Sequence, residues 1–330
     1  MAEEPNPRDL GIYFLDVGQG DCTVIVPPKG DGGAIVFDIA DQFVLERFVA
    51  NHGLRVSDVI ASHLDIDHIR GMLGFLRNHM DAIDRVYLGT DRKPEPGQNR
   101  NLRELVEQID AWGEGRPMPN IIPKDNWRDH EGPVTIREGK DWKVEIILPF
   151  NTTRHKVELR DGQHPNVVSA VLRIEREGTA VLVGGDAKEE AKAWKTYGDL
   201  YDRVNAELAV ISVGTNNPKK WSHPHADHVE AIRRGGRCRT LCTQLTPRCH
   251  EHPLELRGIM MERATMVEPP YRHWKRGSTE VPCAGTIAVW IDGSGELHHE
   301  PSRSSEHSKL LLRVDDPMCE RDPRVTADSA

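Results

Sequence analysis

The sequence predicts an α/β fold with α+β character, in which two β-sheets pack face to face and helices cover the outside. Three observations lead to this expectation. Short apolar segments alternate with helical segments in the first half of the chain, longer apolar strands open the second half, and each half contains both kinds of element. Because a sheet must bury an apolar face against another layer, two such halves are expected to stack around a shared core.

The first part of the chain is expected to supply short strands and one well-marked helix. A helix is predicted over 41–52, because Val44, Leu45 and Phe48 recur at helical spacing. Asp41 is its expected N-cap, and Gly53 is expected to end it. Strands are predicted at 12–16, 23–26, 34–38 and 58–61, with the turn Gly18-Gln19-Gly20-Asp21 after the first.

The remaining elements are read from shorter apolar runs. Further helices are expected at 69–78, 102–112 and 226–234, with helical spacing also at Ala187, Ala191 and Trp194. Further strands are expected at 85–88, 143–148, 167–175, 180–183, 208–213, 286–291 and 310–314. Residues 113–141 are interpreted as loops with short β segments, and 238–282 as irregular.

Three parts are expected along the chain. A core spans residues 10–235, and a Cys- and His-rich extension over 236–314 completes the sandwich. Residues 315–330 are polar and are expected to form a flexible tail.

The composition is that of a folded protein of 330 residues with a net charge of −9. No run of about 18 apolar residues suggests a membrane helix, and no apolar signal-peptide segment follows Met1, so a cytoplasmic location without a membrane is expected. The acidic balance argues against a broadly basic nucleic-acid-binding surface. One local basic groove, or a metal that neutralises phosphate, stays compatible with it.

The segment Ser62-His63-Leu64-Asp65-Ile66-Asp67-His68 carries the strongest chemical signal. Four metal-ligating side chains follow directly after a predicted strand, and a strand end is a rigid support on which lone pairs can converge. Residues 63, 65 and 67 would project together in an extended segment, and a turn would bring His68 to them. Imidazoles with carboxylates suit zinc, manganese or iron. The alternative is a polar loop that caps the next helix.

This motif resembles the metal motif of the metallo-β-lactamase superfamily in its H-x-D-x-D-H variant. The surrounding segments resemble the hydrolase domain of the ComEC family of DNA-uptake proteins, in the correct order over roughly residues 10 to 235. They are Phe14 to Asp21, Val36-Phe37-Asp38, Asn166-Val167-Val168-Ser169, Val183 to Ala187, Val210 to Gly214, Asn217 and His223-Pro224-His225.

The resemblance implies an αββα sandwich with one or two divalent ions, Zn or Mn, at the loop ends of the sheets. His63 and Asp65 would bind one ion, Asp67 and His68 the other, and Asp186 would bridge both. Paired ions of this kind activate a water and stabilise the leaving oxygen.

Roles in catalysis and support also follow from the resemblance. Asp67 and His68 are the implied catalytic residues, and Asp67 would orient the water. Asp38 would hold a ligand or the loop from behind; a simple strand-ending turn residue is the alternative.

Two departures from the superfamily pattern stand out. Most members place a histidine near the N-x-x-S segment, where this chain has Asn166, and His164 lies two residues earlier. The usual His-His-Gly-Ser segment after Asp186 is missing. His223 or His225, or further along His228, could replace its ligand, or these histidines could be loop and helix-start residues.

A second cluster lies in the C-terminal extension and could bind a structural zinc ion. Its members are Cys242, Cys249, His250 and Cys283, with His252, Cys238 and Cys319 as additional candidates. The alternative is a set of buried thiols that act as small hydrophobic side chains.

The leading functional hypothesis is metal-dependent hydrolysis of a phosphodiester, with DNA or RNA as the substrate. A nucleic acid or another phosphodiester is therefore the expected partner, and a protein partner is plausible. The alternatives are a hydrolase of a small ester, thioester or cyclic nucleotide, and a catalytically impaired interaction module.

Overall fold

The computed structural model describes most of the sheets and of the loops around them. The described residues are 6–63, 65–88, 104, 105, 107, 120–123, 133–148, 169–184, 206–215, 232, 238–263, 279–301 and 306–319. None of the helices within these ranges is long and apolar enough to cross a membrane.

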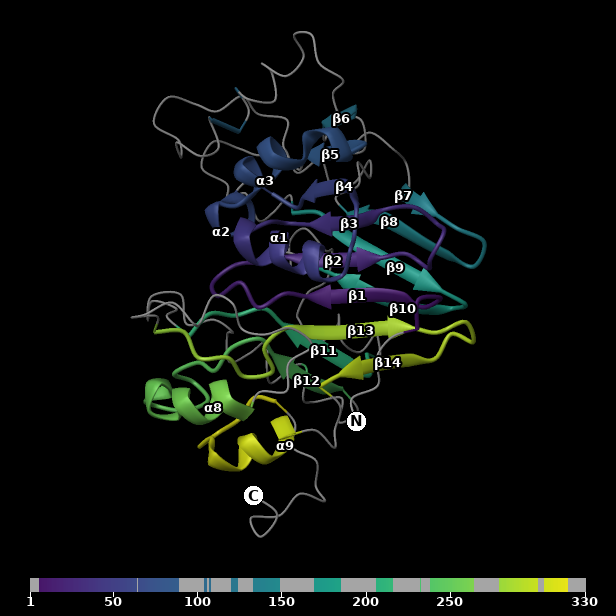
Figure 1. Cartoon of the computed structure of the whole chain (residues 1–330). Helices are drawn as coiled ribbons and strands as arrows, with labels where there is room; N and C mark the ends of the chain where they lie inside the picture. Colours follow the sequence, from purple (N-terminus) through teal and green to yellow (C-terminus); the bar gives the residue numbers. More distant parts are fainter. Residues whose placement is uncertain are drawn as a thin grey trace, which may run out of the picture.

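A large mixed sheet joins the two ends of the chain (Figure 1). Its order is β14-β13-β1-β2-β3-β4-β5-β6, antiparallel up to β3 and parallel from β3 to β6. The strands are β1 (Leu10–Phe14), β2 (Thr23–Val26), β3 (Ala34–Phe37), β4 (Val56–Ala61), β5 (Arg85–Leu88), β6 (Asn120–Pro123), β13 (Ile287–Ile291) and β14 (Leu297–Glu300). The C-terminal strands thus extend the N-terminal sheet.

Two smaller sheets come from the middle of the chain. Four antiparallel strands are ordered β10-β9-β8-β7, and β11 pairs in parallel with β12. The strands are β7 (Val134–Glu138), β8 (Trp142–Leu148), β9 (Val171–Arg176), β10 (Thr179–Val183), β11 (Leu208–Ile211) and β12 (Arg239–Cys242).

The core between the sheets follows from the alternation of side chains along each strand. Leu10 and Ile12 of β1 belong to one buried cluster with Val144 of β8 and Leu172 of β9. Successive residues of a strand point to opposite faces, so Tyr13 belongs to a different cluster. Two sheets therefore face each other across an apolar layer, which confirms the predicted α/β class.

Helices cover the other face of the large sheet. In α1 (Gln42–Asn51) and α3 (Met72–His79), Phe48 and Phe75 are buried in the cluster that contains Tyr13. As predicted, the Asp41 side chain caps α1: it accepts hydrogen bonds from the backbone N–H groups of Phe43 and Val44.

The helix predicted over 69–78 begins earlier and is interrupted. A short α2 (Ile66–Ile69) precedes α3, with Gly71 between them. The Gly71 N–H donates to the carbonyl of Ile39 at 2.8 Å instead of continuing the helix. A Cβ at Gly71 would lie 2.4 Å from the backbone nitrogen of Gln42, so only glycine allows this close contact.

Two predictions for the C-terminal part were wrong. The strand expected at 310–314 is α9 (Glu306–Leu310) followed by η5 (Leu311–Arg313). Leu310 and Leu311 are both buried, which a helical turn permits and an alternating strand does not. The irregular stretch expected over 238–282 contains β12, η4 (Pro253–Leu256) and α8 (Arg257–Arg263), and β14 was not predicted.

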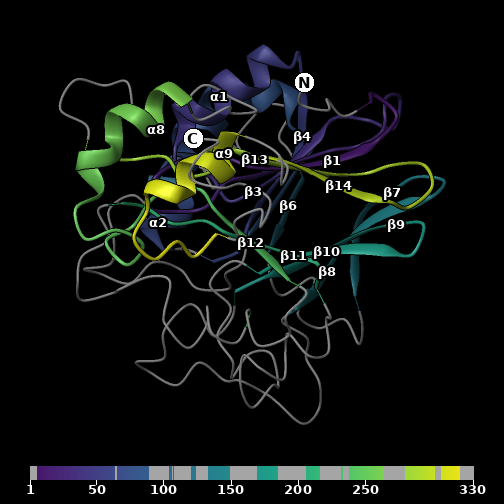
Figure 2. The same cartoon turned by 90° about the horizontal axis from the view of Figure 1, so that it is seen from below.

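The chain end is packed further than predicted. Met318 and Cys319 lie within the expected flexible tail but are 2% and 3% exposed. They belong to an apolar cluster with Leu310, Leu311 and Val314. Figures 1 and 2 show α8 and α9 side by side at this end of the molecule, near β12.

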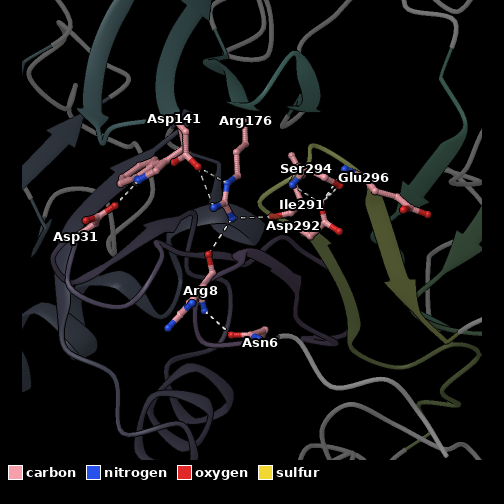
Figure 3. A network of polar contacts seen from close by, with 10 residues as sticks. Asn6, Arg8, Asp31, Asp141, Arg176, Ile291, Asp292, Ser294 and Glu296 are labelled. Carbon is pink, nitrogen blue, oxygen red and sulfur yellow. Dashed lines mark hydrogen bonds and ion pairs between the residues drawn. The ribbon is translucent and has the colours of Figure 1, made fainter.

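Arg176, at the end of β9, ties the two sheets together (Figure 3). Its Nη1 donates to the carbonyls of Arg8 and Ile291 at 2.9 and 3.0 Å. Its Nε and Nη2 donate to Asp141 Oδ2 at 3.1 and 3.0 Å. Ile291 pairs with Leu10 at the start of β1, so this network lies at the edge of the large sheet where β1 begins.

Candidate metal centre at the ends of β3 and β4

The metal motif lies where two neighbouring parallel strands end. Asp38 follows β3 directly, and Ser62 and His63 follow β4 directly. The carboxyl ends of parallel strands meet at one edge of a sheet, and the Ser62 N–H donates to Asp38 Oδ1 at 2.7 Å across this edge. The helical turn α2 then carries Asp67 and His68 back over the same edge (Figure 1).

Asp38 is the centre of a buried hydrogen-bond network. Its side chain is fully buried, and its backbone has a left-handed φ of 59°. Besides the Ser62 N–H, the carboxylate accepts from the Ser62 hydroxyl and from His68 Nδ1, each at 2.7 Å to Oδ2. An ionised carboxylate only accepts hydrogen bonds, so His68 donates through Nδ1, and the neutral imidazole then has its lone pair on Nε2.

The same network fixes the second imidazole. His63 Nδ1 lies 2.9 Å from the Ser62 hydroxyl oxygen. Because Ser62 gives its only hydroxyl proton to Asp38, His63 Nδ1 must be the donor in this contact, which leaves the lone pair on Nε2. One carboxylate thus sets the tautomer of both histidines.

The geometry around His63 Nε2 fits a metal ion. His63 is 1% exposed, and its Nε2 has no hydrogen-bond partner among the described residues. It lies 3.4 Å from Asp65 Oδ2. Two ligand atoms each about 2.1 Å from a tetrahedral ion are about 3.4 Å apart. A buried lone pair beside a carboxylate at this spacing is a suitable pair of ligands.

The other motif residues, Asp67 and His68, belong to α2. The rings of His63 and His68 have centroids 4.1 Å apart, and the Asp67 side chain is half-buried. Asp21, Asp38 and His68 offer ligand atoms within 4.8 Å of one another. Since Nδ1 of His68 is already bonded to Asp38, the other ring nitrogen is the one suited to an ion.

The Gly-rich turn after β1 packs directly on the motif. The Asp21 N–H donates to the carbonyl of Asp67 at 3.2 Å, and the Ile39 N–H donates to that of His68 at 2.7 Å. A Cβ on Gly20, whose φ is 134°, would lie 2.2 Å from the Asp67 carbonyl oxygen. Gly20 is therefore required for the close approach that holds α2 in place.

Buried polar groups connect this turn to the C-terminal part. Gln244 Nε2 donates to Asp16 Oδ1 at 2.8 Å, and its Oε1 accepts from the Thr215 N–H at 2.8 Å. The Asp16 N–H donates to the Thr286 hydroxyl at 3.1 Å. Burial raises the pKa of the nearby Cys22 thiol, and the charge of Asp38 adds to this, so Cys22 stays a neutral packing group.

The structure brings together His63, Asp65, His68 and Asp38, and Asp67 precedes His68 in α2. The other predicted site residues lie outside the described residues: His164, Asn166, Asp186, His223 and His225. Sequence reasoning gave no role to the Ser62 hydroxyl, although its position before the motif histidine was a signal. Among the described motif residues, Asp67 departs from the expected extended geometry, because it lies in α2, which begins at Ile66.

The C-terminal thiols gather in one apolar cluster, with a different composition from the one predicted. Cys283 lies with His307 and Cys319, within 4.8 Å of each. The Cys242 N–H donates to Cys319 Sγ at 3.2 Å. His250 Nδ1 instead contacts Asp315 Oδ2 at 2.8 Å. Burial raises the pKa of the Cys249 thiol, whose sulfur accepts from the Thr246 hydroxyl at 3.7 Å.

Comparisons with known proteins show the family of the chain. A family model described as the metallo-β-lactamase superfamily matches residues 15–210. No curated protein matches the chain.

Two similar solved structures are a metallo-β-lactamase fold protein, YhfI, from Bacillus subtilis and the short form of human tRNase Z. The first is 14% identical over 72% of this chain and 87% of that chain, with a TM-score of 0.41. The second is 12% identical over 72% of this chain and 93% of that chain, with a TM-score of 0.40. The family match spans more than half of the sequence, so the chain belongs to the metallo-β-lactamase superfamily of metal-dependent hydrolases.

Proposed function

We propose that the chain is a metal-dependent phosphodiesterase that cleaves DNA or RNA at a centre built on residues 63–68. Membership of a hydrolase superfamily supports the reaction class. The observation that carries the proposal is the Asp38 network, which leaves an Nε2 lone pair on both His63 and His68. Fixing ligand histidines through a carboxylate behind them is a common feature of catalytic metal sites.

Each side chain of the motif has a distinct proposed role. His63 and Asp65 hold one ion, and Asp67 and His68 hold a second. The 3.4 Å spacing of His63 Nε2 and Asp65 Oδ2 supports the first pair. When bound, divalent ions lower the pKa of a coordinated water and stabilise charge on the leaving oxygen.

The proposal includes residues beyond the described part of the chain. Asp186 is proposed to bridge the ions, and His223 or His225 to supply the ligand that the missing His-His-Gly-Ser segment would provide. Asn166 and His164 are proposed to support the site from the neighbouring segment.

The protein's own groups position the reacting atoms. The half-buried Asp67 carboxylate orients the attacking water by accepting a hydrogen bond from it. His68 Nδ1–H donates a hydrogen bond to Asp38, which holds the ring in its orientation at the site. The apolar layer below β3 and β4 excludes water from the side of the core.

The choice of a phosphodiester rests on the ligand chemistry and on the resemblance to the ComEC hydrolase domain. Two of the four motif ligands are carboxylates, Asp65 and Asp67. Carboxylates favour harder ions such as Mn²⁺, which suit phosphate oxygens, while imidazoles also accept Zn²⁺.

The test is cleavage of single- and double-stranded DNA and RNA by the purified full chain with added Mn²⁺ or Zn²⁺. We compare wild type with Asp67→Ala and with Asp84→Ala, a matched control that removes a half-exposed carboxylate paired with Arg55. Metal-dependent cleavage that is lost only in Asp67→Ala supports the proposal. Cleavage that survives in Asp67→Ala contradicts it.

Two further outcomes would reassign the protein. Bound metal without polynucleotide cleavage, but with turnover of a small ester or cyclic nucleotide, would make it a small-molecule hydrolase. No metal at the motif and no turnover would make it an interaction module in hydrolase form.

A further inference from the structure

A second group of potential ligands lies in the C-terminal part, apart from the motif. Cys283, in the segment before β13, lies with His307 of α9 and Cys319 near the chain end. One ligand atom from each lies within 4.8 Å of the other two, and all three side chains are at most 3% exposed. These residues come from three different segments, so local sequence spacing does not explain their convergence.

The distances within this group fit a tetrahedral zinc ion. Cys283 Sγ lies 3.7 Å from Cys319 Sγ and 3.4 Å from His307 Nε2. With about 2.3 Å for a Zn–S bond and about 2.1 Å for a Zn–N bond, ligand pairs of a tetrahedral ion are about 3.8 Å apart for two sulfurs and about 3.6 Å for sulfur and nitrogen.

A fourth sulfur borders the group. Cys242, the last residue of β12, is fully buried, and its backbone N–H donates to Cys319 Sγ at 3.2 Å. A metal-bound thiolate is only an acceptor, so it can keep this hydrogen bond. Cys242 is not within the 4.8 Å group, so its side chain would have to move to become the fourth ligand.

The surroundings of His307 leave its ring with weak partners. The ring is 2% exposed, and it lies against an apolar cluster that contains Leu310 and Leu311. Its Nε2 contacts the Cys283 sulfur, and its Nδ1 has no hydrogen-bond partner among the described residues. A buried imidazole with so little hydrogen bonding is costly, and a metal bond to Nε2 would offset part of that cost.

We propose that Cys242, Cys283, Cys319 and His307 bind a structural Zn²⁺ ion that is separate from the metal centre on residues 63–68. Binding requires three thiolates and a neutral imidazole, so each Zn²⁺ taken up releases three thiol protons to solvent. The ion has four protein ligands and no open position, which makes the site structural rather than catalytic.

The ion would join segments that share little regular structure. It connects the end of β12, the segment before β13, α9 and residue 319. Gln244 lies two residues after Cys242 and holds Asp16, next to the Gly-rich turn of the metal centre. The zinc ion would therefore also help to hold Gln244, whose contact with Asp16 supports the turn beside the metal centre.

The experiment measures metal content of the full chain in a background without the four motif ligands: His63→Ala, Asp65→Ala, Asp67→Ala and His68→Ala. We expect about one equivalent of zinc to remain in this background. Replacement with Co²⁺ should give sulfur-to-cobalt charge-transfer absorption, because none of the motif residues is a thiol.

Cys283→Ser and Cys319→Ser, added to the same background, should abolish both signals. Cys249→Ser is the matched control, because it removes a buried thiol from the same apolar cluster. It should leave both signals unchanged. If a serine variant does not fold, the cobalt spectrum of the background that keeps all six cysteines still shows whether thiolates bind the metal.

Three results would overturn the proposal. They are zinc content that Cys283→Ser leaves unchanged, a cobalt spectrum without thiolate absorption, and four instead of six free thiols under denaturing conditions. The last result would show that two of the six cysteines form a disulfide, and Cys283 and Cys319, with sulfurs 3.7 Å apart, are the expected pair.

Discussion

The two histidine-containing clusters of this protein are assembled in opposite ways. The centre with Asp38, His63 and His68 comes from the ends of β3 and β4 and from α2, within a short stretch of the sequence. The cluster of Cys242, Cys283, His307 and Cys319 draws on four distant segments. A local sequence motif predicts the first cluster. The residues of the second cluster come together through the pairing of β13 with β1 and the packing of α9.

The strongest way to break the first cluster is Asp38→Asn. The amide keeps the size of the side chain and the contact of Oδ1 with the Ser62 N–H, but its NH₂ group faces two donors, Ser62 Oγ and His68 Nδ1. Breaking such a buried charged network costs about 3–5 kcal/mol of folding stability. Metal affinity at the motif should fall about 10–100-fold.

Denaturant unfolding and metal titration measure the two effects. Asp84→Asn serves as the control, because its ion pair with Arg55 is half-exposed and contributes about 0–1 kcal/mol. Equal metal affinity in Asp38→Asn and wild type would show that Asp38 does not set the histidine tautomers.

The next effect in size comes from Gly20→Ala. The new Cβ would meet the Asp67 carbonyl at 2.2 Å in a backbone conformation that favours glycine. We expect a loss of about 3 kcal/mol in the free energy of unfolding, together with weaker metal binding at the motif. Gly30→Ala is a matched control, since Gly30 also has a positive φ but nothing within 4 Å of the new Cβ.

In the zinc cluster, Gly20→Ala should leave the metal content unchanged. Loss of zinc there would mean that the two clusters are coupled more tightly than their contacts suggest. The measurement is metal content of both sites after gel filtration.

Arg176→Met tests a region outside both clusters. The change removes the donors to the carbonyls of Arg8 and Ile291 and leaves Asp141 without its partner (Figure 3). We expect a loss of about 2 kcal/mol in the free energy of unfolding. Metal content and hydrolysis per folded molecule should stay at the wild-type level. The Arg176 network lies where β1 begins, whereas the metal centre lies where β3 and β4 end. A fall in metal affinity without a fall in stability would contradict this separation.

The smallest effect is expected at Glu46, between α1 and α3. Partial burial alone would raise the pKa of this carboxyl, but hydrogen bonds from Asn78 and Gln42 outweigh it and hold the pKa below its ordinary value. The resulting stabilisation is present above the unfolded-state pKa and is lost as the pH falls through the lower folded-state pKa. Glu46→Gln should cost about 0.5 kcal/mol at pH 7 and nothing in strong acid. A difference from wild type that does not change with pH would exclude the charge as its cause.

Sequence reasoning found the first cluster because its parts obey local rules. The apolar runs at 23–26 and 85–88 gave strands with the observed bounds, and Asp41 capped α1 as expected. Asp38 was expected to support the motif from behind, and its contacts with Ser62 and His68 are consistent with that proposal. The early start of α2 was not predictable from apolar spacing, since backbone hydrogen bonds from Asp21 and Ile39 hold it.

The second cluster could not be predicted because its members meet only in the folded chain. The run from Leu310 to Val314 suits a short strand or a helical turn equally well. Reading it as a strand hid the helix that carries His307. Cys319 lies in a segment that is polar overall and was therefore expected to be flexible. Its two apolar side chains, Met318 and Cys319, are nevertheless buried.

The most direct test of the central claim is an anomalous difference map at the metal absorption edge, from crystals of the full chain grown with Zn²⁺ or Mn²⁺. We expect a peak within bonding distance of His63 Nε2 and Asp65, and the Nδ1 atoms of His63 and His68 still bonded to Ser62 and Asp38. A metal ion bound to Nδ1 of His68 would contradict the proposed centre. So would a map without a peak at the motif, if the same protein preparation binds its full complement of metal in solution.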